Sequence, residues 1–186
     1  KEGIAAGEYS GAFFISTEED STVKIRIPVS FVITSSAVPP VTVWEADTSW
    51  YEEDRWAEEY TLYTADELAG LAVIANTEHQ FGGKTVKLGA DIDLENQEWT
   101  PIGIWNGPDN FPASFSGVFD GQGHTISNLT ISDQSLKYIG LFGWIGAGAI
   151  VSNLTLENVT VSGSNYVGAL TGFVDTYEGR IALIKN

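Results

Sequence analysis

Hydrophobic and polar residues alternate along residues 23–34 (VKIRIPVSFVIT), which predicts a β-strand with one buried face. An apolar run at residues 9–15 (YSGAFFI) predicts another strand, and the polar STEEDS at residues 16–21 predicts the turn between them. Pro28 has no backbone donor, so it favours an edge position or a bulge. Because two strands alone do not form a stable unit, we expect further structure to cover them.

Residues 37–59 form an aromatic and acidic linker that begins near a Pro-Pro pair, which favours an extended chain. Trp44, Trp50 and Trp56 recur every six residues. In an extended strand this even spacing would place the indoles on one face, as in a sugar-stacking platform. The alternative, which we favour, is that these side chains pack the linker against its neighbours.

A helix is predicted at residues 64–78. Thr64 and Glu67 form a capping box at its start, and alanine and leucine at helical spacing provide an apolar face. Gly82 and Gly83 follow and stop the helix. No other segment has a comparable helical period.

In the second half, short apolar segments are separated by Gly, Asn and Asp, and internal repeats appear. ISNLTI (126–131) recurs as VSNLTL (151–156), which begins 25 residues later, and LFGWI (141–145) recurs as LTGFV (170–174). Interleaved repeats of this length predict a solenoid of parallel strands, in which stacked coils bury one another's apolar faces.

Similar segments also precede the two copies of the second repeat: KYIG (137–140) stands before LFGWI, and NYVG (165–168) stands before LTGFV. Gly143 and Gly172 hold matched positions within it. We expect both glycines to lie where φ is positive or where two backbones approach closely.

Asn128 and Asn153 hold matched positions in the first repeat, so we expect them to stack in successive coils as a buried ladder of amides. Both also lie in N-x-T sequons, as does Asn158. Because the sequons coincide with the repeat, we interpret them as a by-product of the solenoid and not as glycosylation sites.

From residue 60 onward six segments follow one another: YTADELAGLAVIAN, GKTVKLGADIDL, WTPIG, FSGVFDGQGHTISNLTI, YIGLFGWI and YVGALTGFV. In this order they resemble the β-helix proteins that carry the GLUG motif. The resemblance covers residues 60–174, and the motif stands here as GLFG (140–143) and ALTG (169–172), where Ala169 departs from it. Such proteins occur on bacterial and some archaeal cell surfaces. The resemblance implies an extracellular location and a right-handed parallel β-helix, pectate-lyase-like in shape, with the helix as a cap on its first coil. It supplies no catalytic residue.

Residues 1–36 resemble the last two strands of the immunoglobulin-like sandwich repeats of bacterial surface proteins. The predicted fold class is therefore all-β: a partial sandwich segment (1–36), the linker (37–59) and a helix-capped parallel β-helix (60–186). RIALIKN (180–186) is typical of a further solenoid strand. We expect the polypeptide to continue beyond both ends, or another chain to pair with the open strand edges.

The amino-acid composition limits the classes of partner that the chain can bind. The 186 residues include 25 acidic and 9 basic side chains, for a net charge of -16, which disfavours nucleic acid and anionic membranes. The absence of cysteine excludes disulfides and thiolate metal sites. No apolar run approaches the roughly 20 residues needed to span a bilayer, so we expect no membrane insertion within this chain. No cofactor is predicted.

The chemistry-bearing residues do not form an enzyme signature. The DGQGH segment (120–124) resembles the first coil of pectin-degrading β-helix enzymes. Hydrolases of that shape need paired carboxylates as acid and base, and His124 lacks the flanking pattern of those hydrolases. Asp91 and Asp93 alternate with apolar residues and should share the outer face. A calcium ion could bind there, but we favour a solvated strand face, and His79 and His124 are too isolated for a transition metal.

The preferred function is therefore an extracellular adhesin or display module that binds a glycan or a protein without catalysis. Loops on rigid scaffolds carry recognition, and residues 104–114 form the longest irregular loop. The candidate ligand-binding residues are Trp105, Asn106, Asp109, Asn110 and Phe111. We weigh this interpretation against a plain spacer loop, which is the commoner role of such an insertion. A structural stalk without a ligand is the rival function, and a polysaccharide-degrading enzyme is the third.

Overall fold

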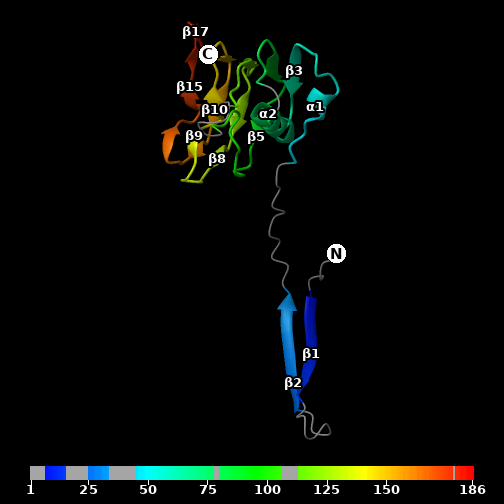
Figure 1. Ribbon diagram of the computed structural model, residues 1–186. Coiled ribbons are helices and arrows are strands. Elements are labelled where there is room, and N and C mark those ends of the chain that lie inside the picture. The colour runs from blue at the N-terminus through cyan, green and yellow to red at the C-terminus, as the bar shows by residue number, and fades with distance from the viewer. Residues whose placement is uncertain (1–6, 16–24, 34–44, 78–79, 106–112, 178) are drawn as a thin grey trace. The chain divides into compact units, whose positions relative to one another are not determined.

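The computed structural model describes residues 7–15, 25–33, 45–77, 80–105, 113–177 and 179–186, and the chain divides into two compact units, Lys1–Thr42 and Val43–Asn186. In the first unit, β1 (Gly7–Ile15) and β2 (Ile25–Ile33) form an antiparallel pair in which Tyr9 lies opposite Phe31 (Figure 1). The two predicted strands are confirmed. Their membership of a sandwich stays a prediction.

The second unit contains mostly short strands. Its first part comprises α1 (Ser49–Glu52), β3 (Glu59–Leu62), α2 (Ala65–Thr77), β4 (Thr85–Leu88), β5 (Ile92–Asp93), β6 (Val118–Asp120), β7 (Thr125–Ser127) and β8 (Thr130–Ile131). Its second part comprises β9 (Lys137–Ile139), β10 (Phe142–Ile145), β11 (Ile150–Ser152), β12 (Thr155–Glu157), β13 (Thr160–Val161), β14 (Asn165–Val167), β15 (Thr171–Val174), β16 (Thr176–Tyr177), β17 (Arg180–Ile181) and β18 (Leu183–Lys185).

Parallel pairing joins most of these strands to partners about 30 residues away in the sequence. The widest sheet has the order β18-β11-β6-β4-β3, and the next has the order β12-β7-β5. Further parallel pairs join β8 with β13, β9 with β14 and β10 with β15, whereas β16 and β17 form an antiparallel hairpin. The described chain is therefore mostly β, with parallel sheets, as predicted. In RIALIKN, where one strand was expected, β17 belongs to the hairpin with β16, and only β18 pairs in parallel, with β11.

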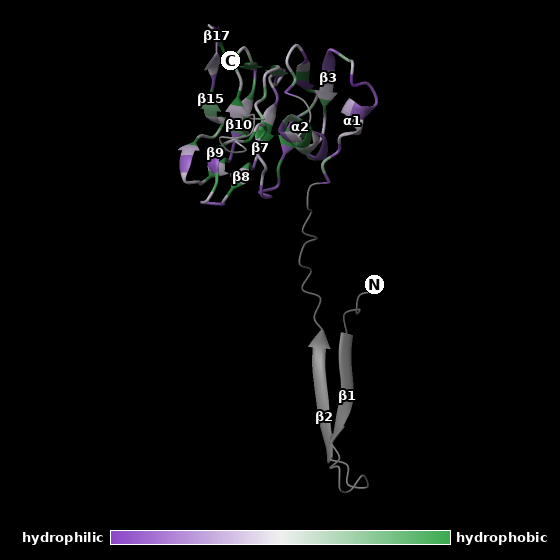
Figure 2. Cartoon of the chain, viewed as in Figure 1, coloured by the Kyte–Doolittle hydropathy of each residue, from purple (hydrophilic) through white to green (hydrophobic). Residues whose placement is uncertain are grey.

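The core lies between these sheets. Its largest fully buried side chains include Phe81, Phe115, Phe119 and Phe142, whose neighbouring rings lie 5.3 to 6.4 Å apart in tilted, stacked and edge-on contacts. Aromatic rings bury large apolar areas, so this cluster contributes much of the packing free energy. Figure 2 shows hydrophobic residues along α2 and the strands next to it.

Helix α2 agrees with the predicted 64–78. The Thr64 Oγ1 accepts a hydrogen bond from the Glu67 N–H at 3.2 Å, and the Glu67 carboxylate accepts one from the Thr64 N–H at 3.0 Å, so the capping box is confirmed. The apolar face of α2, including Leu68 and Leu71, is buried in the core. Among the described residues, no helix has the length and apolar content needed to cross a membrane.

The predicted pairing of the first repeat is wrong. Ser127 lies opposite Glu157 and Thr130 opposite Thr160, which places Asn128 level with Asn158 and not with Asn153. Segments 126–131 and 151–156 therefore do not stack on each other. They look alike in sequence because each runs from a strand through a left-handed asparagine into the next strand, at two different corners.

The favoured interpretation of the tryptophans, that they pack against neighbouring structure, holds for Trp50, whereas the extended strand that the sugar-stacking alternative needs is not formed there. Trp50 lies in α1, where its ring contacts Tyr60 at 5.0 Å and Phe81 at 6.2 Å. Trp56 lies in a turn with 92% of its surface exposed, so it neither joins a platform nor packs the linker. Trp44 lies outside the described residues. A helical turn breaks the two-residue periodicity on which the platform depended.

Candidate functional site

Two tyrosines in unusual backbone conformations mark one side of the second unit. Tyr138 in β9 and Tyr166 in β14 hold matched positions, because the residues on either side of them are paired. Their φ angles are 58° and 56°, in the left-handed region, which costs a residue with a Cβ roughly 1–2 kcal/mol. Their rings stack at 4.5 Å with an interplanar angle of 5°, and stacking of this kind returns about 0.5–1.5 kcal/mol. Stacking therefore offsets only part of the strain.

Three more rings complete an aromatic column, which consists of Trp105, Tyr138, Trp144, Tyr166 and Phe173. Trp105 stacks on Trp144 at 5.3 Å and 11°, and Trp144 contacts Phe173 at 4.5 Å. Trp144 is almost fully buried, whereas 38% of Trp105 and 55% of Tyr166 remain exposed. The column thus connects the interior to the surface and presents aromatic rings to solvent.

Gly143 and Gly172 make room for the backbone of these tyrosines. A Cβ at Gly143 would lie 2.6 Å from the carbonyl oxygen of Tyr138, and one at Gly172 would lie 2.5 Å from that of Tyr166. Neither glycine has a positive φ. Of the two reasons that the sequence offered, close backbone approach is therefore the correct one.

A groove of about 530 Å³ lies beside Trp105 and Tyr138. The rest of its lining comes from residues 98–104 and 133–139, and we call it the aromatic groove. One face of the Trp105 ring is covered by Trp144, so its exposed surface is the other face and the ring edge. A concave site of this size with exposed aromatic rings is typical of small-ligand sites.

Buried contacts fix the near wall of the aromatic groove. Asn76 in α2 donates from Nδ2 to the Pro101 carbonyl at 3.0 Å, and its Oδ1 accepts the Gly103 N–H at 2.7 Å. The buried Trp99 donates from Nε1 to the Leu141 carbonyl at 3.2 Å. Because side-chain hydrogen bonds hold this segment at several points, the wall is set before any ligand arrives.

Polar side chains lie along the same groove. Glu98 accepts hydrogen bonds from the Ser132 N–H at 2.7 Å and the Ser132 hydroxyl at 2.8 Å, and Asp133 accepts two from Ser135 at 2.8 and 2.7 Å. The side-chain and backbone donors of Ser135 hold the pKa of Asp133 below its usual value. Lys137 adds an exposed ammonium group to the lining. The groove therefore combines aromatic surface with acceptors and a donor.

The structure places only part of the predicted site. Trp105 lines the aromatic groove, but Asn106, Asp109, Asn110 and Phe111 lie outside the described residues. The sequence interpretation missed Tyr138, Lys137 and Asp133. A signal for Tyr138 was present, because KYIG and NYVG carry a tyrosine at matched positions of a repeat. An aliphatic residue would pack a core equally well, so the repeated tyrosine indicated a further role.

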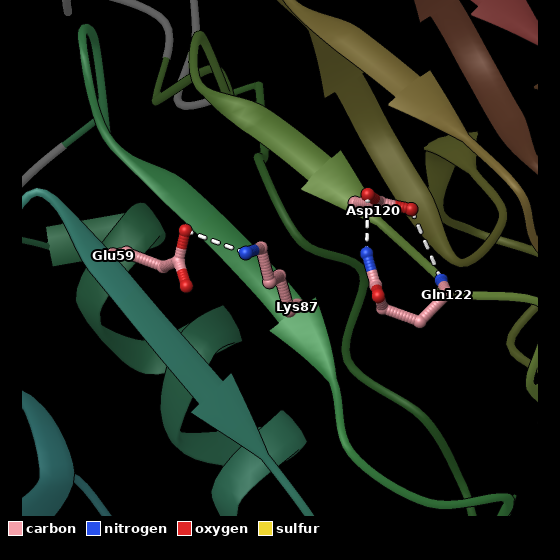
Figure 3. Close-up of polar contacts among 4 residues, drawn as sticks. All are labelled: Glu59, Lys87, Asp120 and Gln122. Atoms are coloured by element: carbon pink, nitrogen blue, oxygen red, sulfur yellow. Dashed lines mark hydrogen bonds and ion pairs between the residues drawn. The ribbon is translucent and has the colours of Figure 1, made fainter.

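A second polar region follows the corners at the ends of β5 and β6. Asn128 donates from Nδ2 to Asp93 at 2.7 Å, and Asn153 donates in the same way to Asp120 at 2.9 Å. Asp120 also accepts the Gln122 N–H at 3.0 Å, while Lys87 and Glu59 form an ion pair at 2.6 Å on the neighbouring strands (Figure 3). The expected ladder of stacked amides is therefore replaced by amide–carboxylate pairs, and these are exposed, not buried.

These corner carboxylates are held ionised. The Asn128 side chain and the Glu95 N–H lower the pKa of Asp93. Burial acts to raise the pKa of Asp120, but hydrogen bonds from Asn153 and Gln122 hold it below its usual value. The Thr125 N–H and then His124, whose Nδ1 lies 3.1 Å from the carboxylate, lower the pKa of Asp91.

Asp91 and Asp93 share the outer face, as predicted, and alternate with the buried Ile92 and Leu94. Both carboxylates already accept hydrogen bonds within the protein. Among the described residues, no three His, Cys, Asp or Glu side chains form a group that could hold a metal ion. His79 lies outside those residues. The predicted lack of a metal site stays a prediction.

Comparison with known proteins gives two relatives. The chain is 35% identical over 119 residues to halomucin of Haloquadratum walsbyi, an alignment that covers 59% of this chain and 1% of halomucin. It is 34% identical over 137 residues to a protein of Evansella cellulosilytica that is named as a Gly-rich membrane protein, covering 70% of this chain and 15% of that protein. The chain thus spans a small part of either relative. No family model matches the chain, and no solved structure matches it.

Proposed function

We propose that this chain is part of an extracellular surface protein and that it binds a ligand, without catalysis, in the aromatic groove. The second unit would be a right-handed parallel β-helix of the GLUG-motif type, capped by α2. Parallel partners about 30 residues apart support this fold, since each coil then returns to the same sheets. Crossovers between parallel strands are almost always right-handed.

The names of the relatives support the location. One is halomucin and the other is named as a membrane protein, and the names of both are compatible with the cell surface. The large excess of acidic residues keeps such a domain soluble outside the cell. An adhesin or display role follows if the groove has a ligand.

The observation that carries the binding role is the strained Tyr138 beside the exposed Trp105. A bulky residue in the left-handed region costs free energy, and strained residues cluster at functional sites. Here the strained residue lines the aromatic groove, next to a half-exposed indole and ionised carboxylates. A purely structural strand would be served better by a glycine or an asparagine at that position.

A structural stalk is the second candidate, and one observation favours it. Tyr138 and Tyr166 stack on each other across the paired strands, so part of their contribution is to the stability of the fold. A stalk would need this stacking but no ligand. The two functions therefore differ in what Trp105 does, because its exposed face contributes nothing to a stalk.

The test is a binding screen of the full 186-residue chain against immobilised glycans and proteins, together with an assay for release of reducing ends from polysaccharides. Binding that is lost in Trp105→Ala and kept in Trp56→Ala supports the proposal, because Trp56 is an exposed tryptophan outside the groove. Absence of binding favours the stalk. Release of reducing ends would overturn the non-catalytic role.

A further inference from the structure

The aromatic groove contains groups that recognise one chemical class of ligand. Its lining offers ring faces, hydrogen-bond acceptors and hydrogen-bond donors within one hollow. A second hollow of about 460 Å³ beside α2 shares Glu98, Trp99, Thr100 and Ile104 with it, so the surface continues past the first groove. A ligand with several similar units would fit this length better than a single small molecule.

The aromatic part suits a pyranose ring. The ring centroids of Trp105 and Tyr138 lie 6.0 Å apart with an angle of 48° between the ring planes, so the two rings form an angled apolar surface at the groove. Sugar rings have faces of C–H bonds that pack on aromatic rings, while their hydroxyl groups point sideways. Such packing uses the apolar body of Trp and Tyr and leaves their polar atoms free.

The polar part suits hydroxyl groups. An ionised carboxylate is an acceptor only, and Asp133 receives both hydrogen bonds from Ser135 on one oxygen, Oδ1. Hydroxyl groups of a ligand can donate to the carboxylates of Glu98 and Asp133, and can accept from the Lys137 ammonium group. A ligand that both donates and accepts along its length matches this mixture.

Charge separates the remaining classes. The chain carries a net charge of -16, and Glu98 and Asp133 add local negative charge, which repels a polyanion such as a uronic-acid polymer. A strongly basic peptide is repelled only by Lys137 and is attracted by the carboxylates, so charge does not exclude this class and titration with hexalysine tests it. A neutral polyhydroxylated ligand suffers neither penalty.

We propose that the aromatic groove binds a neutral oligosaccharide, with Trp105 and Tyr138 as the stacking surface, Glu98 and Asp133 as hydroxyl acceptors and Lys137 as a donor. This inference rests on the proposed ligand-binding function of the same groove. It adds the ligand class: neutral sugars bind and acidic sugars do not.

The experiment titrates the full chain with neutral hexasaccharides of gluco, manno, galacto and xylo configuration, with hexagalacturonate and with hexalysine, by calorimetry and tryptophan fluorescence. At least one neutral hexasaccharide is expected to bind at millimolar concentration or below, with little dependence on salt. Trp105→Ala should weaken this binding about tenfold or more, and Asp133→Asn should weaken it severalfold. Trp56→Ala and Asp175→Asn are the matched controls. Asp175 also accepts a backbone N–H, from Thr176 at 2.7 Å, but lies outside the groove lining.

The outcomes are distinct. Binding of hexagalacturonate, hexalysine or a protein that depends on Trp105, without binding of any neutral hexasaccharide, overturns the inference and leaves the proposed function standing. Neutral sugar binding that survives Trp105→Ala also overturns it, because the groove is then not the site. If none of the tested ligands binds, both the inference and the proposed function are overturned.

Discussion

Two pairs of residues, Asn128 with Asn153 and Tyr138 with Tyr166, share the same left-handed backbone conformation but are held in it by different forces. The asparagines have φ angles of 60° and 52°, and each donates its side-chain amide to an aspartate on the strand paired with the one that it follows, β5 for Asn128 and β6 for Asn153. The tyrosines have φ angles of 58° and 56° and are held by ring stacking and by the absence of a Cβ at nearby glycines.

The difference separates positions that the fold alone explains from positions that it does not. Asparagine tolerates the left-handed region, and each of these two gains a hydrogen bond to a carboxylate at the neighbouring strand, so the corners cost little. Tyrosine gains no such bond, and only part of its strain is offset. The asparagine corners are therefore explained by the fold alone, whereas the tyrosine positions are not. For Tyr138, the ligand proposed for the aromatic groove would supply the missing reason.

The largest expected effect comes from filling the space under the tyrosines. Gly143→Val and Gly172→Val should each destabilise the second unit by about 3 kcal/mol or more, because the new side chain meets backbone atoms that cannot move away. Gly82→Val is the control, since nothing lies within 4 Å of a Cβ there. Chemical denaturation measures all three. Equal stability of the three variants would contradict the close approach.

The next effect separates strain from stacking at Tyr138. Tyr138→Ala should lower the free energy of unfolding by about 2 kcal/mol, because the ring contacts with Tyr166 and Trp144 are removed while the backbone strain remains. Tyr138→Gly should be more stable than Tyr138→Ala by roughly 1 kcal/mol, since glycine adopts a positive φ freely. Thermal melts of the two variants give the comparison, and a glycine variant that is no more stable than the alanine variant removes the strain argument.

At the corners the expected effect is smaller. Asn128→Ala and Asn153→Ala should each cost about 1 kcal/mol more than Asn158→Ala, because all three lose the residue that tolerates the left-handed region but only the first two lose a hydrogen bond to a carboxylate. Among the described residues, the Asn158 side chain has no hydrogen-bond partner, which makes it the matched reference. Denaturation midpoints measure the difference. Equal losses at the three positions would show that the amide–carboxylate pairs contribute nothing.

The smallest effect concerns pH. Hydrogen bonds lower the pKa of Asp93 and Asp120 in the folded state, so the unfolded chain binds protons first as the pH falls. The stabilisation is present above the ordinary carboxylate pKa of about 4 and is lost as the pH falls through the lower folded values. Urea midpoints between neutral and acidic pH should therefore decline below about pH 4. Asn128→Ala should flatten this decline and Asn158→Ala should not. A slope unchanged in Asn128→Ala would exclude Asp93 as a contributor.

Patterns that depend on a local period were predictable. The alternation around Asp91 and Asp93 gave the correct faces, and Thr64 with Glu67 gave the correct start of α2. In both cases the physical cause lies within a few residues, so the sequence alone contains it.

Features that depend on distant partners were not predictable. The similarity of 126–131 to 151–156 suggested one stacking register, but two corners of the same chemistry produce similar sequences whether or not they pair. The contacts of Trp105 with Trp144, and of Asn76 with Pro101 and Gly103, join segments far apart in sequence. No pattern within either segment encodes them.

Parallel pairing between strands about 30 residues apart also determines how the second unit should respond to force. In the proposed β-helix, when the two ends of the second unit are pulled apart, the ladders of one coil carry the load before those of the next, so the strands detach in sequence and not all together. Each detached coil would release about 100 Å of extended chain, given a reach of about 3.3 Å per residue. A protein exposed to shear would then lengthen in discrete steps and absorb mechanical work at each one, while the coils that have not yet opened keep their shape.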